Sequence, residues 1–242
     1  MKRLPFFLVA VSILSGCSIY RPQSVDIPLL EQAGETRIDA AVGASAVVVL
    51  PDAFTLNATG SHAFTDHIAG QVHANVGTGV YYLQAAPGVY TRLGSKGRLE
   101  GYAGLGFGGS MSQAGETGSR RYDYDGHYGL VFAQGNIGWR HLGPLEVGFG
   151  LKLGALLPRF DYYEFHDEEN PAAVTAHEQY STGNFLLEPQ LQLRLGSDEV
   201  KFTTRLGFCW LSDLDGDGAY FSSSDHFVHD MFTLSIGLCF TL

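Results

Sequence analysis

Carboxylates alternate with other residues in one acidic stretch near the end of the chain. Asp213, Asp215 and Asp217 are followed by a glycine, which is the first half of a calcium-loop pattern. The second half is missing, because Ser224 stands where the pattern needs a bidentate Glu, although Asp225 is adjacent. We therefore expect a solvated acidic loop and no cofactor. A calcium site formed by Asp213, Asp215, Asp217 and Asp225 is the alternative.

A second set of acids and histidines could activate a water molecule. They come from two distant stretches: Asp123 and Asp125 in the first, and Asp225, His226, His229 and Asp230 in the second. They resemble the site of omptin proteases, ten-stranded outer-membrane barrels that use an Asp pair and an Asp/His pair across the mouth. This chain departs from that family because it is shorter, carries a lipobox-like motif and lacks the Asp-x-His spacing. The resemblance implies a hydrolase with its site at the barrel rim, as an alternative to a protein without catalysis.

The elements that would position these residues are strands, because apolar and small or polar residues alternate at period two over most of the chain. Ten candidate strands lie at about 36–50, 53–64, 67–77, 81–94, 98–112, 127–141, 144–158, 184–196, 199–212 and 227–242. Tight turns at 65–66, 94–97, 141–144 and 196–199 fall at one end of such a meander, and long connections at 113–126, 159–183 and 213–226 fall at the other. Outer-membrane barrels are built in this way. The predicted fold is all-β, a single closed antiparallel transmembrane β-barrel of about ten strands in an up-and-down meander.

The two faces of the predicted strands differ as a membrane barrel requires. In the strand at 199–212, Phe202, Leu206 and Phe208 share one face, while Lys201 and Arg205 share the other. A soluble barrel turns its apolar face inward, and an exterior of Leu and Phe would aggregate in water. In hydrocarbon that face is favourable, whereas a Lys or Arg on it costs about 2 to 4 kcal/mol at the midplane. We therefore expect the apolar face to meet lipid.

The opposite faces predict a polar network in the lumen. Its expected members are Arg37, Asp39, Glu100, Glu146, Lys152, Glu188, Arg194 and Arg205. Because an isolated buried charge costs several kcal/mol, these groups must pair or meet water. Ten strands enclose little more than the eight at which side chains fill a barrel. We expect a network that fills and stiffens the barrel, with a narrow ion or small-solute channel as an alternative.

Two cysteines are predicted to stay free. Cys209 and Cys239 lie in the last two predicted strands, and the hairpin between them would place Cys209 opposite about Asp230. The nine residues from there to Cys239 extend roughly 30 Å. A disulfide needs Cα atoms within about 7 Å.

The amino end predicts export. Lys2 and Arg3 precede an apolar run from Leu4 to Leu14 that is too short to span a membrane, as is typical of a secretory signal peptide. The run closes on Leu14-Ser15-Gly16-Cys17, which resembles the lipobox of bacterial lipoproteins and implies cleavage before Cys17 and acylation of that residue. We expect a signal peptide at 1–16, a lipidated periplasmic tether at 17–35 and the barrel at 36–242. An apolar patch, Ile27, Leu29 and Leu30, leaves a second placement open for the tether, beneath or within the barrel.

The mature chain is similar to small lipidated outer-membrane barrels of Gram-negative bacteria, a group mostly without assigned activity. The most family-like segments are 20–30 and Ala63-Phe64-Thr65-Asp66-His67-Ile68. The resemblance implies outer-membrane lipid, lipopolysaccharide and the barrel-insertion machinery as partners, and extracellular long loops. The formal net charge of −10 argues against nucleic acid. We expect a structural or surface protein with acidic loops and no catalysis.

Overall fold

The computed structural model describes residues 20–23, 25–46, 53–77, 79–113, 121–165, 174–181, 183–213, 219–220 and 230–242. Thirteen strands lie in these ranges: β1 (Thr36–Ala46), β2 (Ala53–Ala63), β3 (Ile68–Gly77), β4 (Val80–Leu93), β5 (Gly97–Gln113), β6 (Arg121–Leu142), β7 (Leu145–Phe165), β8 (Val174–Tyr180), β9 (Asn184–Gly196), β10 (Val200–Phe208), β11 (Trp210–Asp213), β12 (Ala219–Tyr220) and β13 (Phe232–Thr241). Within the described ranges, no helix is long and apolar enough to cross a membrane. The predicted signal peptide and Cys17 lie outside the described residues.

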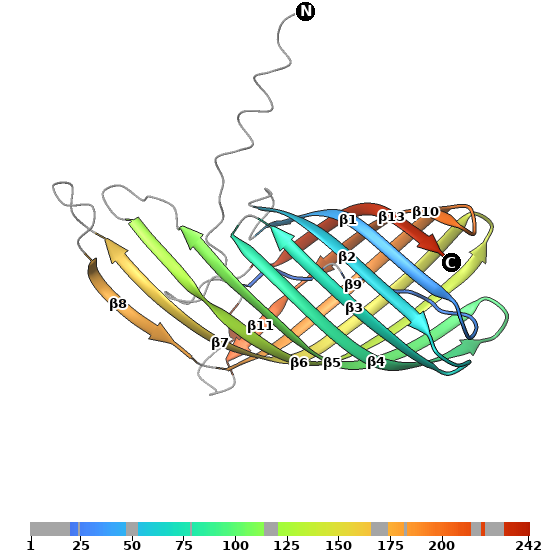
Figure 1. Cartoon of the computed structure of the whole chain (residues 1–242), viewed down its shortest axis with the longest axis horizontal. Coiled ribbons are helices and arrows are strands. Elements are labelled where there is room, and N and C mark those ends of the chain that lie inside the picture. Colours follow the sequence, from blue (N-terminus) through green and yellow to red (C-terminus); the bar gives the residue numbers. More distant parts are fainter. Residues whose placement is uncertain are drawn as a thin grey trace, which may run out of the picture.

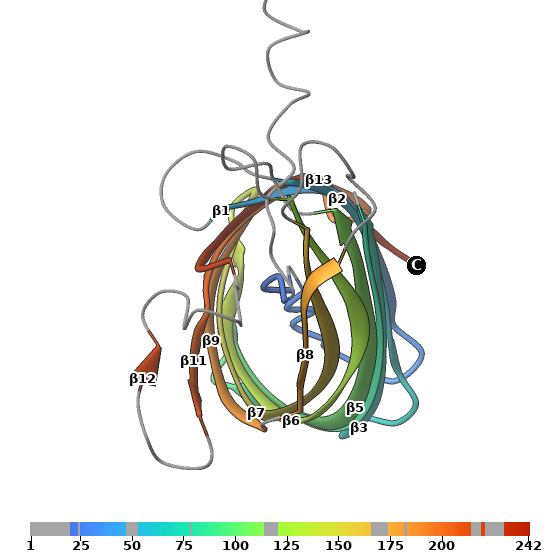
Figure 2. The same ribbon diagram turned by 90° about the vertical axis from the view of Figure 1, so that its left-hand side faces the viewer.

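Ten of the strands close into a barrel. Strands β1 to β7 pair with one another in chain order, β7 pairs with β9, and β10 lies between β9 and β13 and pairs with both. The ring closes because β13 also pairs with β1, from Arg37 opposite Thr241 to Ala46 opposite Phe232. Every pair is antiparallel, and Figure 2 looks into the resulting ring. The predicted fold class, an all-β closed antiparallel barrel of about ten strands, is confirmed.

The two ends of the barrel differ. At one end, here called the turn end, short links join β2 to β3, β4 to β5, β6 to β7 and β9 to β10, and β1 begins beside the end of β13. At the other end, the loop end, β7 continues past the ring and forms a hairpin with β8 (Figure 1). The prediction that 159–183 is a loop was therefore wrong in part. The loop that was predicted at 113–126 is shorter in the structure, because β6 already begins at Arg121.

Burial alternates along the ring strands with the period that the sequence predicts. In β9, Leu191, Leu193 and Leu195 point outward and are 42 to 55% exposed, while Gln192 and Arg194 are buried. The described outward face of β7 carries no charge from Leu145 to Leu157. The outward surface is therefore a continuous apolar band, which is favourable against hydrocarbon and unfavourable in water.

Cys209 and Cys239 are free and buried, as predicted. Cys209 N donates a hydrogen bond to Met231 O (2.7 Å), just before β13, at the loop end. Cys239 lies opposite Asp39 and Lys201, near the turn end. The two thiols therefore lie at opposite ends of the lumen.

Candidate functional site

The lumen of the barrel is occupied by the residues that precede β1. Residues 20–35, called the strap below, run through the ring of strands, with Ser24 outside the described part; Figure 2 shows this segment in blue inside the ring. Every described residue from Tyr20 to Leu30 is buried. Residues 20–30 therefore do not form the predicted periplasmic tether. The structure places them within the barrel, which is the second of the two positions that their apolar patch left open.

Lumen-facing side chains of β9 hold the strap through its backbone. Gln190 Nε2 donates to Val25 O (2.5 Å), and the next lumen residue, Gln192, donates to Ile27 O (2.8 Å) and accepts from Ile27 N (3.1 Å). Arg194 Nη1 then donates to Pro28 O (3.4 Å). A buried peptide group needs a hydrogen-bond partner. Polar side chains of β9 therefore supply to the strap what a neighbouring strand would supply in a sheet.

Side chains of β3, β5 and β6 also form hydrogen bonds with the backbone of the strap. Gln71 Nε2 donates to Asp26 O (2.8 Å) and Arg140 Nη1 donates to Leu29 O (3.0 Å). Glu100 Oε1 accepts from Leu30 N (2.7 Å). The strap is thus bound from several sides of the ring and not only along one strand.

Glycines on the wall make room for the apolar side chains of the strap. A Cβ added at Gly148 would lie 3.0 Å from Ile27 Cγ2, and one added at Gly138 would lie 2.7 Å from Leu29 Cδ2. Beside Ile27, the space between strap and wall is about 10 Å³. This is roughly the volume that one water molecule needs. The lumen is therefore filled at this level.

Asp26 is the most enclosed charge of the strap. Its carboxylate pairs with Arg194 and, at 2.8 Å, with Arg205 Nη2. Arg205 also pairs with Asp39 of β1. Asp26 and both arginines are at most 1% exposed. Because unpaired charges in such surroundings cost several kcal/mol, each of these groups depends on the others.

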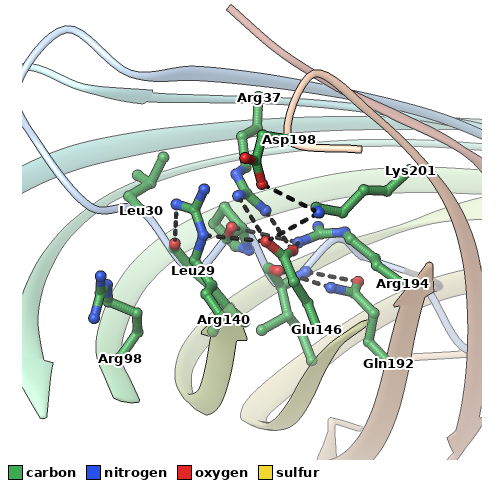
Figure 3. A network of polar contacts seen from close by, with 12 residues as sticks. Leu29, Leu30, Arg37, Arg98, Arg140, Glu146, Gln192, Arg194, Asp198 and Lys201 are labelled. Atoms are coloured by element: carbon green, nitrogen blue, oxygen red, sulfur yellow. Dashed lines mark hydrogen bonds and ion pairs between the residues drawn. The ribbon is translucent and has the colours of Figure 1, made fainter. Parts of the chain in front are cut away.

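A second ion cluster lies closer to the turn end, around Glu146 (Figure 3). The Glu146 carboxylate lies 3.0 Å from Arg37 Nη1 and 3.1 Å from Arg140 Nε. Arg194 Nη1 at 3.3 Å and Lys201 Nζ at 3.9 Å complete its set of cations. One acid of the wall thus faces four bases, so the wall alone does not neutralise this region.

The strap supplies the missing negative charge. The buried residues described outside the strap include the bases Arg37, Arg98, Arg140, Lys152, Arg194, Lys201 and Arg205 and the acids Asp39, Glu100, Glu146, Glu188 and Asp230, two fewer acids than bases. The strap adds three acids, Asp26, Glu31 and Glu35, and one base, Arg21, which balances the count. Glu35 Oε1 lies 2.8 Å from Arg140 Nη1, and Glu31 pairs with Arg98. The strap and the lumen are therefore complementary in charge as well as in shape.

At the loop end the strap is held by an aromatic and ionic cluster. Tyr20 donates its hydroxyl hydrogen to Glu188 Oε1 (2.8 Å) and packs edge to face on Tyr128, with 5.3 Å between ring centroids. Lys152 Nζ lies 3.4 Å from Glu188 Oε2. Arg21 pairs with Asp230, which also accepts from Ser45. The strap is thus fixed at both of its ends.

All eight residues expected in the lumen network are buried there: Arg37, Asp39, Glu100, Glu146, Lys152, Glu188, Arg194 and Arg205. Sequence reasoning missed the acids that the strap contributes, Asp26, Glu31 and Glu35, and the wall bases Arg98 and Arg140. In β5 and β6, the alternation places Arg98 and Arg140 on the same faces as Glu100 and Asn136. The sequence therefore contained the pattern that could have identified both arginines as lumen residues.

The residues proposed for a protease-like rim do not come together where the structure describes them. Asp125 is exposed on the outward side of β6, where it lies opposite Asp161 of β7. Asp230 is buried in the lumen. The side chain of Asp123 and the residues Asp225, His226 and His229 lie outside the described part. An outward-facing Asp125 and an inward-facing Asp230 cannot activate one water molecule.

An outward pocket of about 590 Å³ lies beside the rim, and Asp161, one of its lining residues, pairs with a histidine in a way that the sequence did not indicate. It is lined in part by Asp125, Arg159 and Asp161. His177 Nε2 of β8 lies 2.9 Å from Asp161 Oδ1, and Gln179 Nε2 donates to the same oxygen (3.0 Å). These hydrogen bonds hold the pKa of Asp161 below its usual value. This pair connects β8 to the part of β7 that projects beyond the ring.

The predicted calcium site lies almost wholly outside the described residues. Asp215, Asp217 and Asp225 lie outside the described residues, and only the backbone of Asp213 is described, at the end of β11. Among the residues that are described, no group of three or more His, Cys, Asp or Glu could hold a metal ion.

Comparisons with known proteins identify the fold but not a family. No protein-family model matches the chain, and no curated protein matches its sequence. Among solved structures, the outer-membrane protease OmpT of Escherichia coli is similar over 86% of this chain and 97% of its own, with 9% identity and a TM-score of 0.57. The translocator domain of the autotransporter NalP from Neisseria meningitidis covers 86% of this chain and 88% of its own, with 12% identity and a TM-score of 0.45. At such identities the likeness to OmpT shows the barrel fold alone.

Proposed function

We propose that this chain is a lipoprotein of the outer membrane, anchored through an acylated Cys17, whose barrel is closed by its own strap and serves as a structural surface protein. Its long acidic loops face the outside, and the protein performs no catalysis. Its partners are outer-membrane lipid, lipopolysaccharide and the barrel-insertion machinery. The apolar outward band supports the membrane location.

The observation that carries this proposal is the filled lumen. The strap satisfies its own backbone with Gln190, Gln192 and Glu100, and it neutralises the excess bases of the wall. A barrel that conducted solutes would need this space for water. A closed barrel instead gives a rigid support for whatever lies at its loop end.

The first test is electrical conductance of the purified protein in a planar lipid bilayer. We expect no steady conductance from the wild-type protein, and a steady pore from it would refute the closed lumen. Deletion of residues 21–34 should open a pore, because it removes the segment that fills the lumen. The wild-type measurement alone decides whether the lumen is closed, even where the deletion variant does not fold.

Catalysis needs a separate test, because a closed lumen does not exclude chemistry at the rim. The protein in micelles is incubated with fluorogenic peptides, phospholipid and lipopolysaccharide, and we expect no turnover of any of them. Turnover that is lost in Asp225→Asn or Asp161→Asn would contradict the non-catalytic part of the proposal. The matched control is Asp198→Asn, a carboxylate at the opposite end of the barrel.

A further inference from the structure

The strap has a direction that determines where the amino end of the mature chain lies. It joins β1 at Thr36, whose N donates to Leu242 O (3.1 Å) at the turn end. Going back along the chain, Leu30 contacts Glu100, Ile27 contacts Gln192 and Val25 contacts Gln190. Because β9 runs from the loop end to the turn end, decreasing residue numbers in the strap move toward the loop end.

Tyr20 marks the far end of this path. Its carbonyl oxygen accepts from Asp230 N (3.0 Å), two residues before β13 begins at the loop end. Its ring packs on Tyr128, which lies opposite Pro158 near the loop end of β7. Between Tyr20 and Thr36 the strap therefore passes through the whole ring.

Cys17 is only three residues from Tyr20. An extended chain spans at most about 3.6 Å per residue, so the two Cα atoms lie within about 11 Å of each other. The ten residues of β13 extend roughly 30 Å, or about 23 Å along the barrel axis at a tilt of about 40°. From Tyr20, Cys17 cannot reach the turn end.

We propose that the acyl chains on Cys17 enter the membrane leaflet at the loop end, so that the protein is anchored from the outside of the cell. This rests on the proposed function, which supplies the acylation and the orientation. The chemical partner is the acyl layer of the outer leaflet. An acyl-bearing cysteine does not pass a lumen in which about 10 Å³ is free beside Ile27. The barrel must therefore close, through pairing of β13 with β1, around a strap that is already threaded.

The lysines of the chain provide a direct test. After residue 16 the chain contains only three lysines, Lys96, Lys152 and Lys201. Lys152 and Lys201 are buried, whereas Lys96 is exposed in the link between β4 and β5 at the turn end. In wild type, Lys96 is therefore the one accessible lysine of the mature chain, and the acylation proposed for Cys17 includes its α-amino group, so that no second amine reacts. A variant that combines Ser18→Lys with Lys96→Arg moves this single amine to the amino end.

The two proteins are treated on intact cells, and again after the outer membrane is permeabilised, with a membrane-impermeant biotinylating succinimidyl ester. We expect the double variant to be labelled on intact cells and wild type only after permeabilisation. Threading is overturned if the two amines react from the same side of the membrane. If they react from opposite sides but wild type is the one labelled on intact cells, threading stands and the proposed orientation of the barrel fails.

Migration of unheated samples in detergent gels verifies that both proteins are folded. Reaction of the unfolded double variant verifies that its introduced amine is reactive.

Discussion

Replacement of Asp26 by Asn tests whether the strap holds the barrel together. The change keeps the shape of the side chain but removes the charge that faces Arg194 and Arg205. Loss of one partner of a buried ion pair costs about 3 to 5 kcal/mol. Arg205 keeps Asp39 and Arg194 keeps Glu146, at 3.3 Å, so the lower end of that range applies. We expect a loss of about 3 kcal/mol in the free energy of unfolding, roughly a hundredfold in the equilibrium constant.

The assay is a urea titration in detergent micelles, followed by the fluorescence of the two tryptophans, Trp139 and Trp210. The matched control is Asp198→Asn, which removes a carboxylate that is 85% exposed and 3.8 Å from Lys201 Nζ. An exposed pair of this kind contributes at most about 1 kcal/mol. Equal losses in Asp26→Asn and Asp198→Asn would refute the burial of the strap in the lumen.

Three further predictions concern the wall. Gly148→Val should displace the strap, lower stability by about 1 to 3 kcal/mol and raise conductance, because its Cβ would meet Ile27 Cγ2 at 3.0 Å, whereas Gly135→Val, which has open space, should change neither quantity. Leu193→Arg should lower stability in lipid vesicles by about 2 to 4 kcal/mol, and an unchanged urea midpoint would contradict a lipid-facing position there. The two buried cysteines should resist thiol reagents until the protein unfolds, so rapid labelling of the folded protein would disprove their burial.

The sequence was sufficient for the ring because strand patterns are local. In β9, five apolar residues from Leu187 to Leu195 alternate with Glu188, Gln190, Gln192 and Arg194, and this alternation alone assigns the two faces. The hairpin of β7 and β8 was not predicted because β8 (residues 174–180) is a short and mostly polar strand. It pairs only with the projecting end of β7. Their pairing depends on no apolar face that a sequence pattern could reveal.

The strap could be predicted only in part, for a different reason. Its apolar residues Ile27, Leu29 and Leu30 indicated that the segment needs cover. What binds it is mostly side chains that contact its backbone, such as Gln192 on both peptide groups of Ile27, at a separation of 165 residues. Backbone groups are the same in every residue, so the sequence of the strap carries no record of such partners.

The charge of the lumen explains why a barrel of this size needs an internal strap. The bases around Glu146 would repel one another in an empty lumen, and water in so narrow a space screens them less than bulk water does. Wall acids could have balanced them, but a wall network alone would leave the interior partly open. Carboxylates on a threaded segment balance the charge and fill the volume together. Because those carboxylates lie on the strap, the lumen is neutral only when the strap is in place, so charge balance and the filling of the lumen depend on the same segment.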